Sequence, residues 1–478
     1  MIEFILNDQD ISTDLPSGTT VLDYVRYHKD LKGTKIGCRE GDCGACTILV
    51  GELIREEVRY RTMTSCLMPL ANAAGKHIVT IEGINPKDGS LTPVQQAMID
   101  ESGTQCGFCT VGFVMSLTGF CIDETAKTPA MGISSVDGNI CRCTGYKSIE
   151  RAAELVCRQL ADSNSRSVPN YFAAIPQRLA KYYGSSRRET GPEPAVPLLG
   201  GGTDVYVQRP DQLGQAEPRP LFYDDELRGI RDLGDIIEIG ASATVTDLLE
   251  STVMQSIFPD LCKHLKLVSS TPIRNMATLA GNFVNASPIG DMTVWFLALD
   301  SDIALESDDG SERTLPLRNL YRGYKDLDKQ PKEIITKIRF PRLGSDFYFN
   351  FEKVCKRTYL DIATVNTAIS LRVETTPAKD WKPPALMESK EMAALPKVDH
   401  LITNAHVSAG GVAPVPLYLK ETSSFLIGRN VDAGTIEKAN EIIQAEISPI
   451  SDVRGSAEYK RLLLRQLFRA HFYELFGI

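Results

Sequence analysis

Long apolar runs are missing from this sequence of 478 residues. The clearest apolar stretches, such as Val294 to Leu299, are far shorter than the roughly 20 residues that a membrane-spanning helix needs. The first residues contain neither a basic region followed by an apolar one nor a twin-arginine pair, so no export signal is expected. These absences favour a cytoplasmic protein without membrane contact.

An excess of positive charge is also missing. The 52 Lys and Arg residues are outnumbered by 61 Asp and Glu residues, which gives a formal net charge of −9. Because nucleic-acid binding depends on basic surfaces, this balance argues against DNA or RNA as a partner. The hydrophobic content of 43% is that of an ordinary globular protein, and the length allows about three domains, each with its own core.

Cysteine is present in an unusual distribution. Nine of the twelve cysteines precede residue 144, and eight of these nine form two sets of four. In the first set, Cys-x4-Cys-x2-Cys is followed by a fourth cysteine after nineteen residues; in the second, Cys-x2-Cys is followed after thirty-one residues by Cys-x-Cys. The first set is Cys38, Cys43, Cys46 and Cys66, and the second set is Cys106, Cys109, Cys141 and Cys143.

The spacing of the first set is that of a plant-type ferredoxin, which holds a [2Fe-2S] cluster. Each iron of such a cluster takes two cysteine sulfurs besides the bridging sulfides, so three close cysteines wrap one side and a distant one returns. Gly37, Gly41 and Gly44 interleave with the close cysteines, where they allow a tight loop and leave N–H groups free to face sulfur. The second set supplies four thiolates for another binuclear cluster.

Zinc and disulfides are the alternatives for four cysteines. Zinc sites usually come as two pairs of closely spaced cysteines, which fits the first set poorly and the second set better. Disulfides fit neither set, because nothing in the chain indicates an oxidising compartment. A zinc-stapled scaffold without redox activity is therefore the competing hypothesis from another functional class. The remaining cysteines are expected to be buried structural thiols: Cys121, Cys157, Cys262 and Cys355.

The pattern around the first set predicts a small β-grasp domain. Residues 2–6 alternate and lead through a hairpin into a second strand, and a helix is expected after the signals at Ser17 to Thr20. The strand Thr47 to Val50 follows the cysteine loop, and the next strand is expected to contain Cys66. The cluster would then lie under a surface loop of this domain.

The periodicity becomes helical at Thr92. With Thr92 as N-cap, Pro93 at the first helical position and Gln95 two residues later, the segment has the form of a capping box. The pattern stays helical to Leu160, so the second cysteine set is expected at helix starts, where the helix dipole favours thiolate charge. The polar segment 161–169 is interpreted as an interdomain linker.

Three consecutive glycines come directly after the apolar pair Leu198-Leu199. Such a loop can bring several N–H groups against a pyrophosphate. Its spacing matches neither the dinucleotide-binding motif nor the P-loop, and a plain tight turn also explains it. A second stretch, Ile273 to Asp291, is rich in small and amide residues that would let a backbone lie along a flat ligand.

The last third of the chain alternates between strand and helix patterns. Residues 347–373 and 399–427 alternate like strands, and residues 435–475 contain helical runs. The segment Thr375 to Lys397, rich in proline, lysine and glutamate, is interpreted as a surface excursion.

Together these motifs resemble the molybdenum hydroxylase family, and most closely the iron–sulfur and flavin subunit of its xanthine dehydrogenases. The resemblance covers nearly the whole chain. The matching segments are Gly37 to Thr47, Gln105 to Thr110, Gly138 to Tyr146, the loop Gly200 to Asp204, Thr278 to Asp291, and Asp452 to Tyr459. One departure is Gly323-Tyr-Lys-Asp, which replaces a more basic segment at the nicotinamide-access loop.

The resemblance implies an α+β multidomain protein. Its domains would be a β-grasp 2Fe-2S ferredoxin domain over 1–88, a helical-bundle [2Fe-2S] domain over 89–161, an FAD domain of the vanillyl-alcohol-oxidase (PCMH) type over 170–345, and a C-terminal α+β domain like that of the CO dehydrogenase flavoprotein over 347–476.

The resemblance also implies a function in electron transfer. A large molybdopterin-binding subunit would oxidise the substrate, and electrons would pass through two [2Fe-2S] clusters to FAD and then to NAD. The residues that oxidise the substrate would lie on that partner, so no catalytic residue is expected in this chain. The resemblance also implies a dimer of heterodimers. The alternative is the same electron-transfer role in a hydroxylase of aldehydes or of other N-heterocycles, with a different electron acceptor.

The family pattern also carries FAD contacts onto particular residues of this chain. Some of them have a simpler explanation, since Thr278 and Asn282 would also serve to cap a turn. The implied contacts are Leu198, Leu199, Gly200, Gly201, Gly202, Thr203, Asp204, Val205, Thr278, Gly281, Asn282, Asp291, Ile335 and Lys353.

Overall fold

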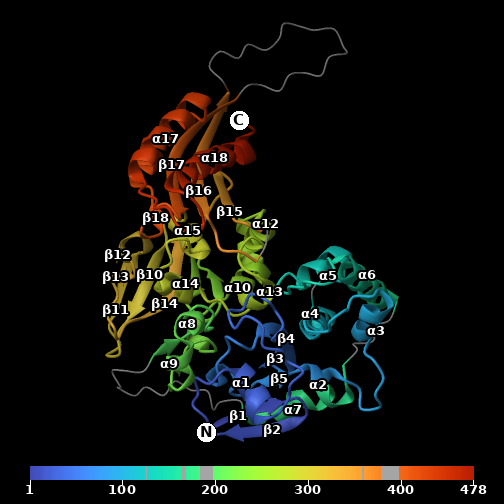
Figure 1. The fold of residues 1–478 in the computed structure, drawn as a ribbon. Helices are drawn as coiled ribbons and strands as arrows, with labels where there is room; N and C mark the ends of the chain where they lie inside the picture. The colour runs from blue at the N-terminus through green and yellow to red at the C-terminus, as the bar shows by residue number, and fades with distance from the viewer. Residues whose placement is uncertain (125, 163–167, 183–196, 358–359, 378–397) are drawn as a thin grey trace, which may run out of the picture. The chain divides into compact units, whose positions relative to one another are not determined.

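The computed structural model describes residues 1–124, 126–162, 168–182, 197–357, 360–377 and 398–478 (Figure 1). Most of the predicted linker and most of the predicted surface excursion lie outside these residues. Within the described part, no helix is long and apolar enough to cross a membrane. The chain divides into two units. Unit 1 is Met1–Gly229, Ala241–Leu248 and Val268–Gly281; unit 2 is Ile230–Gly240, Leu249–Leu267 and Asn282–Ile478.

Unit 1 opens with a β-grasp sheet in the order β2-β1-β5-β3-β4. The predicted hairpin is confirmed, because β1 and β2 pair antiparallel around Asn7, which takes a left-handed backbone (φ +53°) that asparagine tolerates. Strand β5 then pairs parallel to β1 and antiparallel to β3. The strands are β1 (Ile2–Leu6), β2 (Gln9–Thr13), β3 (Thr47–Ile54), β4 (Glu57–Thr64) and β5 (His77–Val79).

A helix follows the hairpin, as the sequence predicts. The hydroxyl of Thr20 accepts from the Asp23 amide and caps α1 (Val21–Asp23), which continues into a π-helical turn, η1 (Tyr24–His28). Val21, Leu22 and Val25 are fully buried in the core of the domain. Burial of each such side chain contributes about 1.5–3 kcal/mol, so this face holds the helix on the sheet.

Cys66 does not lie in a strand, and that prediction is wrong. Strand β4 ends at Thr64; the Ser65 amide makes one more ladder hydrogen bond, to the carbonyl of Cys46 at 3.2 Å, and the Leu67 amide then donates back to the carbonyl of Thr64 at 3.1 Å, which closes a turn. The Ser65 hydroxyl also donates to the Cys46 carbonyl, at 2.7 Å. This turn takes the chain out of the sheet before Cys66.

Helices form the next part of unit 1. The predicted capping box is confirmed at α3, where Thr92 accepts from the Gln95 amide and the Gln95 side chain accepts from the Thr92 amide. Helix α4 is buried over 112–121, and the predicted apolar face of α6 is buried at Ile149 and Val156. The helices are α2 (Ile81–Ile84), α3 (Pro93–Asp100), α4 (Thr110–Ile122), α5 (Pro129–Ser135) and α6 (Lys147–Asp162).

The segment after the linker packs on the β-grasp domain. It consists of η3 (Asn170–Ala174), α7 (Ile175–Leu179) and η4 (Ala180–Tyr182). Ile175 and Leu179 are buried against Ile5, and the Tyr171 hydroxyl donates to the carbonyl of Gly83 at 2.8 Å. Residues 170–182 thereby hold the end of the helical part to the first sheet.

The rest of unit 1 carries the glycine loop. Strand β6 (Leu198–Leu199), which the sequence predicts, pairs parallel with β7 (Arg219–Pro220). Leu199 and Met276 share one hydrophobic core with residues of the β-grasp domain. The other elements here are α8 (Val205–Gln208), α9 (Pro210–Gly214), η5 (Asp225–Leu227) and α13 (Thr271–Arg274).

Unit 2 contains two sheets. The first has the order β11-β10-β14-β9-β8, and the second has the order β15-β16-β17-β18. The strands are β8 (Ile230–Asp232), β9 (Ile236–Gly240), β10 (Asp302–Glu306), β11 (Glu312–Pro316), β14 (Ile334–Pro341), β15 (Phe347–Val354), β16 (Val365–Pro377), β17 (Val398–Gly410) and β18 (Leu417–Tyr418); β12 (Tyr321–Gly323) and β13 (Asp326–Leu327) form a separate hairpin.

The helices of unit 2 include the predicted helical runs at the end of the chain. They are α11 (Thr252–Ile257), α12 (Leu261–Leu265), α15 (Asp291–Leu297), η6 (Leu317–Asn319), α16 (Lys420–Leu426), α17 (Ala433–Glu446) and α18 (Ala457–Phe476). Helices α10 (Val245–Glu250) and α14 (Leu279–Asn285) each contain one of the points at which the chain passes from one unit to the other.

Two expectations for this unit are wrong. Residues 420–426 form helix α16 rather than a strand, because the Glu446 carboxylate accepts the amides of Glu421 and Thr422 and caps the first turn. Cys262 is exposed rather than buried, since α12 buries its neighbour Leu261 instead; Cys355 is only half-buried. Cys121 and Cys157 are buried, as expected.

Candidate functional site

The first cysteine set comes together in unit 1 as two thiol pairs. Cys38 is hydrogen-bonded to Cys43, and Cys46 to Cys66. Cys38 also interacts electrostatically with Cys46 and Cys66, so the pairs are close to one another. The loop Gly37 to Cys46 and the turn after β4 therefore present four sulfurs in a two-plus-two arrangement.

Backbone N–H groups surround the sulfur of Cys38. The amides of Glu40 and Asp42 each lie 3.3 Å from it. The pKa of Cys38 is lowered to about 5 because the Cys43 thiol and these amides donate to it, which outweighs the opposing effect of burial. Gly41 (φ +75°) lies within this loop and has the left-handed backbone that glycine allows. The site is therefore built to hold a thiolate.

The second set forms another two-plus-two arrangement. The Cys143 sulfur lies 3.6 Å from that of Cys106, and Cys109 is hydrogen-bonded to Cys141. The sequence predicts that these cysteines lie at the starts of helices. The prediction is confirmed for Cys109, which is the N-cap of α4, whereas Cys141 and Cys143 lie in the loop that precedes α6. Cys106 and Cys143 are exposed, whereas Cys141 is buried.

In the part of the chain that the structure describes, no three His, Cys, Asp or Glu side chains are arranged to hold a single metal ion. What each set does present is a pair of thiol pairs, the donor arrangement that two irons of a binuclear cluster take up.

The two cysteine sets touch through one turn of the helical part. The amide of Ile140, next to Cys141, donates to the carbonyl of Cys43 at 3.1 Å. The buried side chain of Asn139 donates to the carbonyl of Gly44 at 3.1 Å and accepts from the Ser116 hydroxyl at 2.7 Å. Cys43 of the first set is thus hydrogen-bonded to Ile140, the residue that directly precedes Cys141 of the second set.

The glycine loop also lies against the β-grasp domain. A Cβ atom on Gly201 would stand 1.7 Å from the carbonyl oxygen of Met276, and one on Gly202 (φ +86°) would stand 2.5 Å from that of Leu67, which adjoins Cys66. Only glycine fits at these positions. The Asn72 side chain, which sequence reasoning missed, donates to the carbonyl of Gly200 at 3.0 Å.

The remaining predicted residues of unit 1 lie beside this loop. The Thr278 hydroxyl accepts from the amide of Gly281 at 3.2 Å and would stand 2.9 Å from a Cβ atom on Gly200. Thr203, Asp204 and Val205 lead into α8, with Val205 exposed. The structure therefore brings Gly200 to Gly202, Thr278 and Gly281 together as a narrow backbone cradle.

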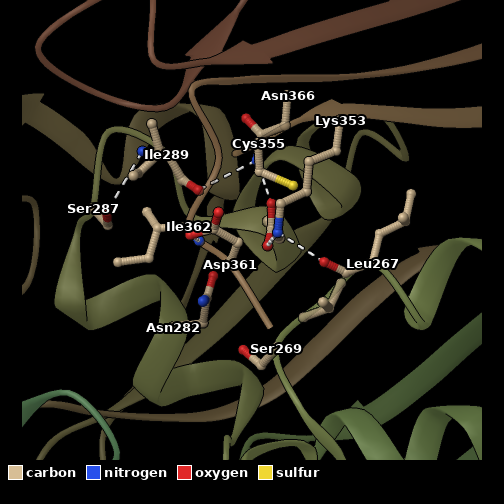
Figure 2. Close-up of polar contacts among 12 residues, drawn as sticks. Leu267, Ser269, Asn282, Ser287, Ile289, Lys353, Cys355, Asp361, Ile362 and Asn366 are labelled. Carbon is tan, nitrogen blue, oxygen red and sulfur yellow. Dashed lines mark hydrogen bonds and ion pairs between the residues drawn. The ribbon is translucent and has the colours of Figure 1, made fainter. Parts of the chain in front are cut away.

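In unit 2, Asp291 and Lys353 form a buried pair. The Lys353 ammonium group, which is fully buried, donates to an Asp291 carboxylate oxygen and to the carbonyl of Leu267, both at 2.7 Å (Figure 2). The Asn366 side chain, another residue that sequence reasoning missed, donates to the other Asp291 oxygen at 2.6 Å. Cys355 lies near this pair (Figure 2).

Two further predicted residues of unit 2 have structural roles. The Asn282 side-chain oxygen accepts from both the amide and the hydroxyl of Thr293 at 3.0 Å, so it ties α14 to α15. Ile335 is 3% exposed on β14, where it pairs with Leu305 of β10 inside the sheet. Asn282 lies within the same unit as the Asp291–Lys353 pair; Ile335 packs in the sheet core.

Four models of protein families match the chain in order. They are the 2Fe-2S iron-sulfur cluster binding domain over 4–71, the [2Fe-2S] binding domain over 80–154, the FAD binding domain in molybdopterin dehydrogenase over 171–343, and the CO dehydrogenase flavoprotein C-terminal domain over 351–475. The chain belongs to the molybdenum hydroxylase family. It corresponds to the iron–sulfur and FAD portion of its members, which are oxidoreductases.

Curated relatives match along nearly the whole chain. Xanthine dehydrogenase of Emericella nidulans is 27% identical over 99% of this chain and 38% of its own length. Xanthine dehydrogenase 1 of Arabidopsis thaliana is 26% identical over 95% and 38%, and aldehyde oxidase 4 of Cavia porcellus is 25% identical over 97% and 38%. The chain thus spans well under half the length of these members of the molybdenum hydroxylase family.

Solved structures match over a shorter part. A chain of carbon monoxide dehydrogenase from Hydrogenophaga pseudoflava is 24% identical over 57% of this chain and 87% of its own, with a TM-score of 0.49. A chain of quinoline 2-oxidoreductase from Pseudomonas putida 86 is 20% identical over 59% and 90%, with the same TM-score.

Proposed function

We propose that this chain serves a xanthine dehydrogenase, carrying electrons from a molybdopterin-binding partner subunit through two [2Fe-2S] clusters to FAD and on to NAD. The observation that carries the proposal is the gathering of two four-cysteine sets as thiol pairs in one unit, joined by the hydrogen bond from Ile140 to Cys43. When bound, the clusters carry single electrons and the flavin converts them into a two-electron transfer.

The residues fit these groups. The cysteine pairs Cys38/Cys43 and Cys46/Cys66 would hold one cluster, and Cys106/Cys143 with Cys109/Cys141 the other. The amides of Glu40 and Asp42, 3.3 Å from the Cys38 sulfur, would stabilise negative charge on that sulfur when it is a ligand.

The glycine cradle fits a pyrophosphate. Gly201 and Gly202 pack without side chains against the carbonyls of Met276 and Leu67, which fixes the loop from behind, and a glycine loop held in this way can present N–H groups to a pyrophosphate. In unit 2, Lys353 and Asp291 supply a buried charge pair whose hydrogen bonds orient both groups. We assign the flavin contacts to these residues and to their neighbours Thr278, Gly281 and Asn282.

Xanthine and NAD are the finer parts of the proposal. The alignment of nearly the whole chain with xanthine dehydrogenases, over 38% of their length, supports xanthine, and NAD rests on the resemblance alone. Aldehyde oxidases match at similar identity, and Gly323-Tyr-Lys-Asp is less basic than the family segment, so a hydroxylase of aldehydes or other N-heterocycles with another acceptor is the second candidate. A dimer of heterodimers and a place in purine catabolism belong to the first candidate.

Replacement of Cys43 by serine tests the proposal in the enzyme assembled with its partner. The harder oxygen ligand should weaken or remove the first cluster, while the second, with its own four sulfurs, keeps its spectroscopic signal. NADH should still bleach the flavin, but substrate-driven reduction of NAD should collapse.

The matched control is Cys262→Ser, which removes an exposed thiol outside both sets and should change neither signal nor turnover. Normal substrate-to-NAD turnover in a Cys43→Ser protein shown to lack the first cluster would overturn the proposal. NADH that fails to reduce the wild-type flavin would favour the second candidate.

A further inference from the structure

One turn of the helical part, residues 137–140, contacts both neighbouring parts of unit 1. It lies directly before Cys141, and its four residues are Asp-Gly-Asn-Ile. On one side it meets the loop of the first cysteine set, and on the other side it meets the segment 268–276, which leads to the glycine cradle.

The contact with the first cysteine set uses Asn139 and Ile140. Asn139 is 6% exposed, and its side chain bridges the Gly44 carbonyl and the Ser116 hydroxyl of α4. Close approach is required on both sides, because a Cβ atom on Gly44 would stand 2.3 Å from the Gly138 carbonyl, and one on Gly112 would stand 2.2 Å from the Gly44 carbonyl. Any group larger than hydrogen at either glycine would force these backbones apart.

The contact with segment 268–276 uses Asp137 and Arg274. One Asp137 oxygen accepts from the Thr271 amide at 2.7 Å, and the other accepts from the Arg274 guanidinium at 2.6 Å. Arg274 is 4% exposed and also donates to the carbonyls of Val268 and Ser269. Both carboxylate oxygens are therefore used, and the pair is held in one geometry.

Segment 268–276 ends against the glycine cradle. Met276 follows Arg274 by two residues, and its carbonyl is the group that leaves no space for a Cβ atom on Gly201. Displacement of Arg274, the last residue of α13, would therefore be passed through Met276 to the loop that we assign to the flavin pyrophosphate.

We propose that residues 137–140 are a positioning element that separately sets two distances: Asn139 fixes the approach of the two clusters, and Asp137 fixes the flavin loop. The inference rests on the proposed function. It makes Asn139 and Asp137 positioning residues, since neither is a ligand candidate. Electron tunnelling falls steeply with distance, so a rigid turn between the clusters keeps their separation constant.

The test uses the full chain loaded with iron and flavin. With both clusters reduced, their unpaired spins interact across the turn, and the resulting splitting of the paramagnetic resonance signals depends on separation. Asn139→Asp keeps the shape of the side chain but puts a carboxylate oxygen against the Gly44 carbonyl. The splitting should be lost or narrowed, with iron content and flavin affinity unchanged.

The second arm replaces Arg274 by methionine. This variant should bind FAD more weakly while leaving the splitting between the clusters at its wild-type value. Arg158→Met is the matched control, because Arg158 is exposed on α6, in the helical part of the chain but outside both cysteine sets; this variant should change neither FAD binding nor the splitting.

The outcomes separate this inference from the proposed function. Wild-type protein without two cluster signals would contradict the proposed function itself. Two interacting signals in the wild type, together with an unchanged splitting in fully loaded Asn139→Asp, would overturn only the positioning role of Asn139. If Asn139→Asp fails to assemble, Ser116→Ala decides: it removes the donor to the Asn139 side chain and should narrow the splitting in the same direction.

Discussion

The Lys353 ammonium group, fully buried, lies 2.7 Å from the carboxylate of Asp291. The pair is completed by the Leu267 carbonyl, which accepts from Lys353, and by Asn366, which donates to Asp291. A buried ion pair is costly to form, and removal of one partner leaves the other charge without compensation. The pair is therefore a position at which substitution should affect both stability and the flavin.

Replacement of Lys353 by methionine should destabilise the protein by about 3 kcal/mol, because Asp291 then stays buried without its cation. Flavin retention should fall with it. Denaturant unfolding and FAD content measure the two effects. The control is Lys438→Met, which breaks the exposed pair with Glu441 and should cost less than about 1 kcal/mol. A Lys353→Met protein with wild-type stability and full FAD content would contradict the assignment.

Replacement of Gly201 by valine should release FAD and leave the iron content intact. The new side chain collides with the Met276 carbonyl and must push the loop out of its position, whereas both cysteine sets lie outside the loop. Equilibrium dialysis of flavin and iron analysis measure the outcome. Gly214→Val is the matched control, because a Cβ atom there meets nothing within 4 Å. Full FAD retention in Gly201→Val would show that this loop is not the phosphate site.

His77 makes the stability of unit 1 depend on pH. Burial lowers the pKa of its imidazole to about 4 and outweighs the hydrogen bond to the Asn7 carbonyl, which acts in the opposite direction; the other ring nitrogen is hydrogen-bonded to the Tyr60 hydroxyl. The unfolded chain takes up the proton near pH 6.5, but the folded chain takes it up only near pH 4. The stability contributed by neutral His77 is therefore constant above pH 6.5 and is lost as the pH falls from 6.5 to 4. The loss at pH 5 should be about 2 kcal/mol.

Unfolding at pH 7 and pH 5 tests this prediction. His77→Gln should lose the part of the pH dependence that comes from the imidazole, so its two unfolding free energies should differ less than those of the wild type. His28→Gln, at an exposed position, should retain the full wild-type difference. An equal pH dependence in His77→Gln and the wild type would show that His77 does not titrate as described.

Local signals in the sequence were sufficient for several elements. The capping box at Thr92 needs only residues within the first helical turn, and the hairpin at Asn7 needs only its own turn residue. The cysteine sets were also predictable as groups, because their spacing reflects the coordination chemistry itself.

Features that depend on distant partners were not predictable. Helix α16 begins because Glu446 caps it from α17, a partner about 25 residues further along the chain. Asn72 and Asn366 bear on the candidate site only through contacts with Gly200 and Asp291, residues far from them in the sequence. A single asparagine carries no pattern that would single it out. The segment around Asn139 could be recognised in the sequence, but the hydrogen bond from Asn139 to the Gly44 carbonyl could not be predicted from it.

The iron, sulfide and flavin content of the purified protein tests the central claim most directly. Two cysteine sets, each arranged as two thiol pairs, predict about four irons and four acid-labile sulfides per chain, together with one FAD and little zinc. Fully loaded protein with two irons per chain would contradict the assignment of a cluster to each set, and colourless protein with zinc in place of iron would contradict the electron-transfer function altogether.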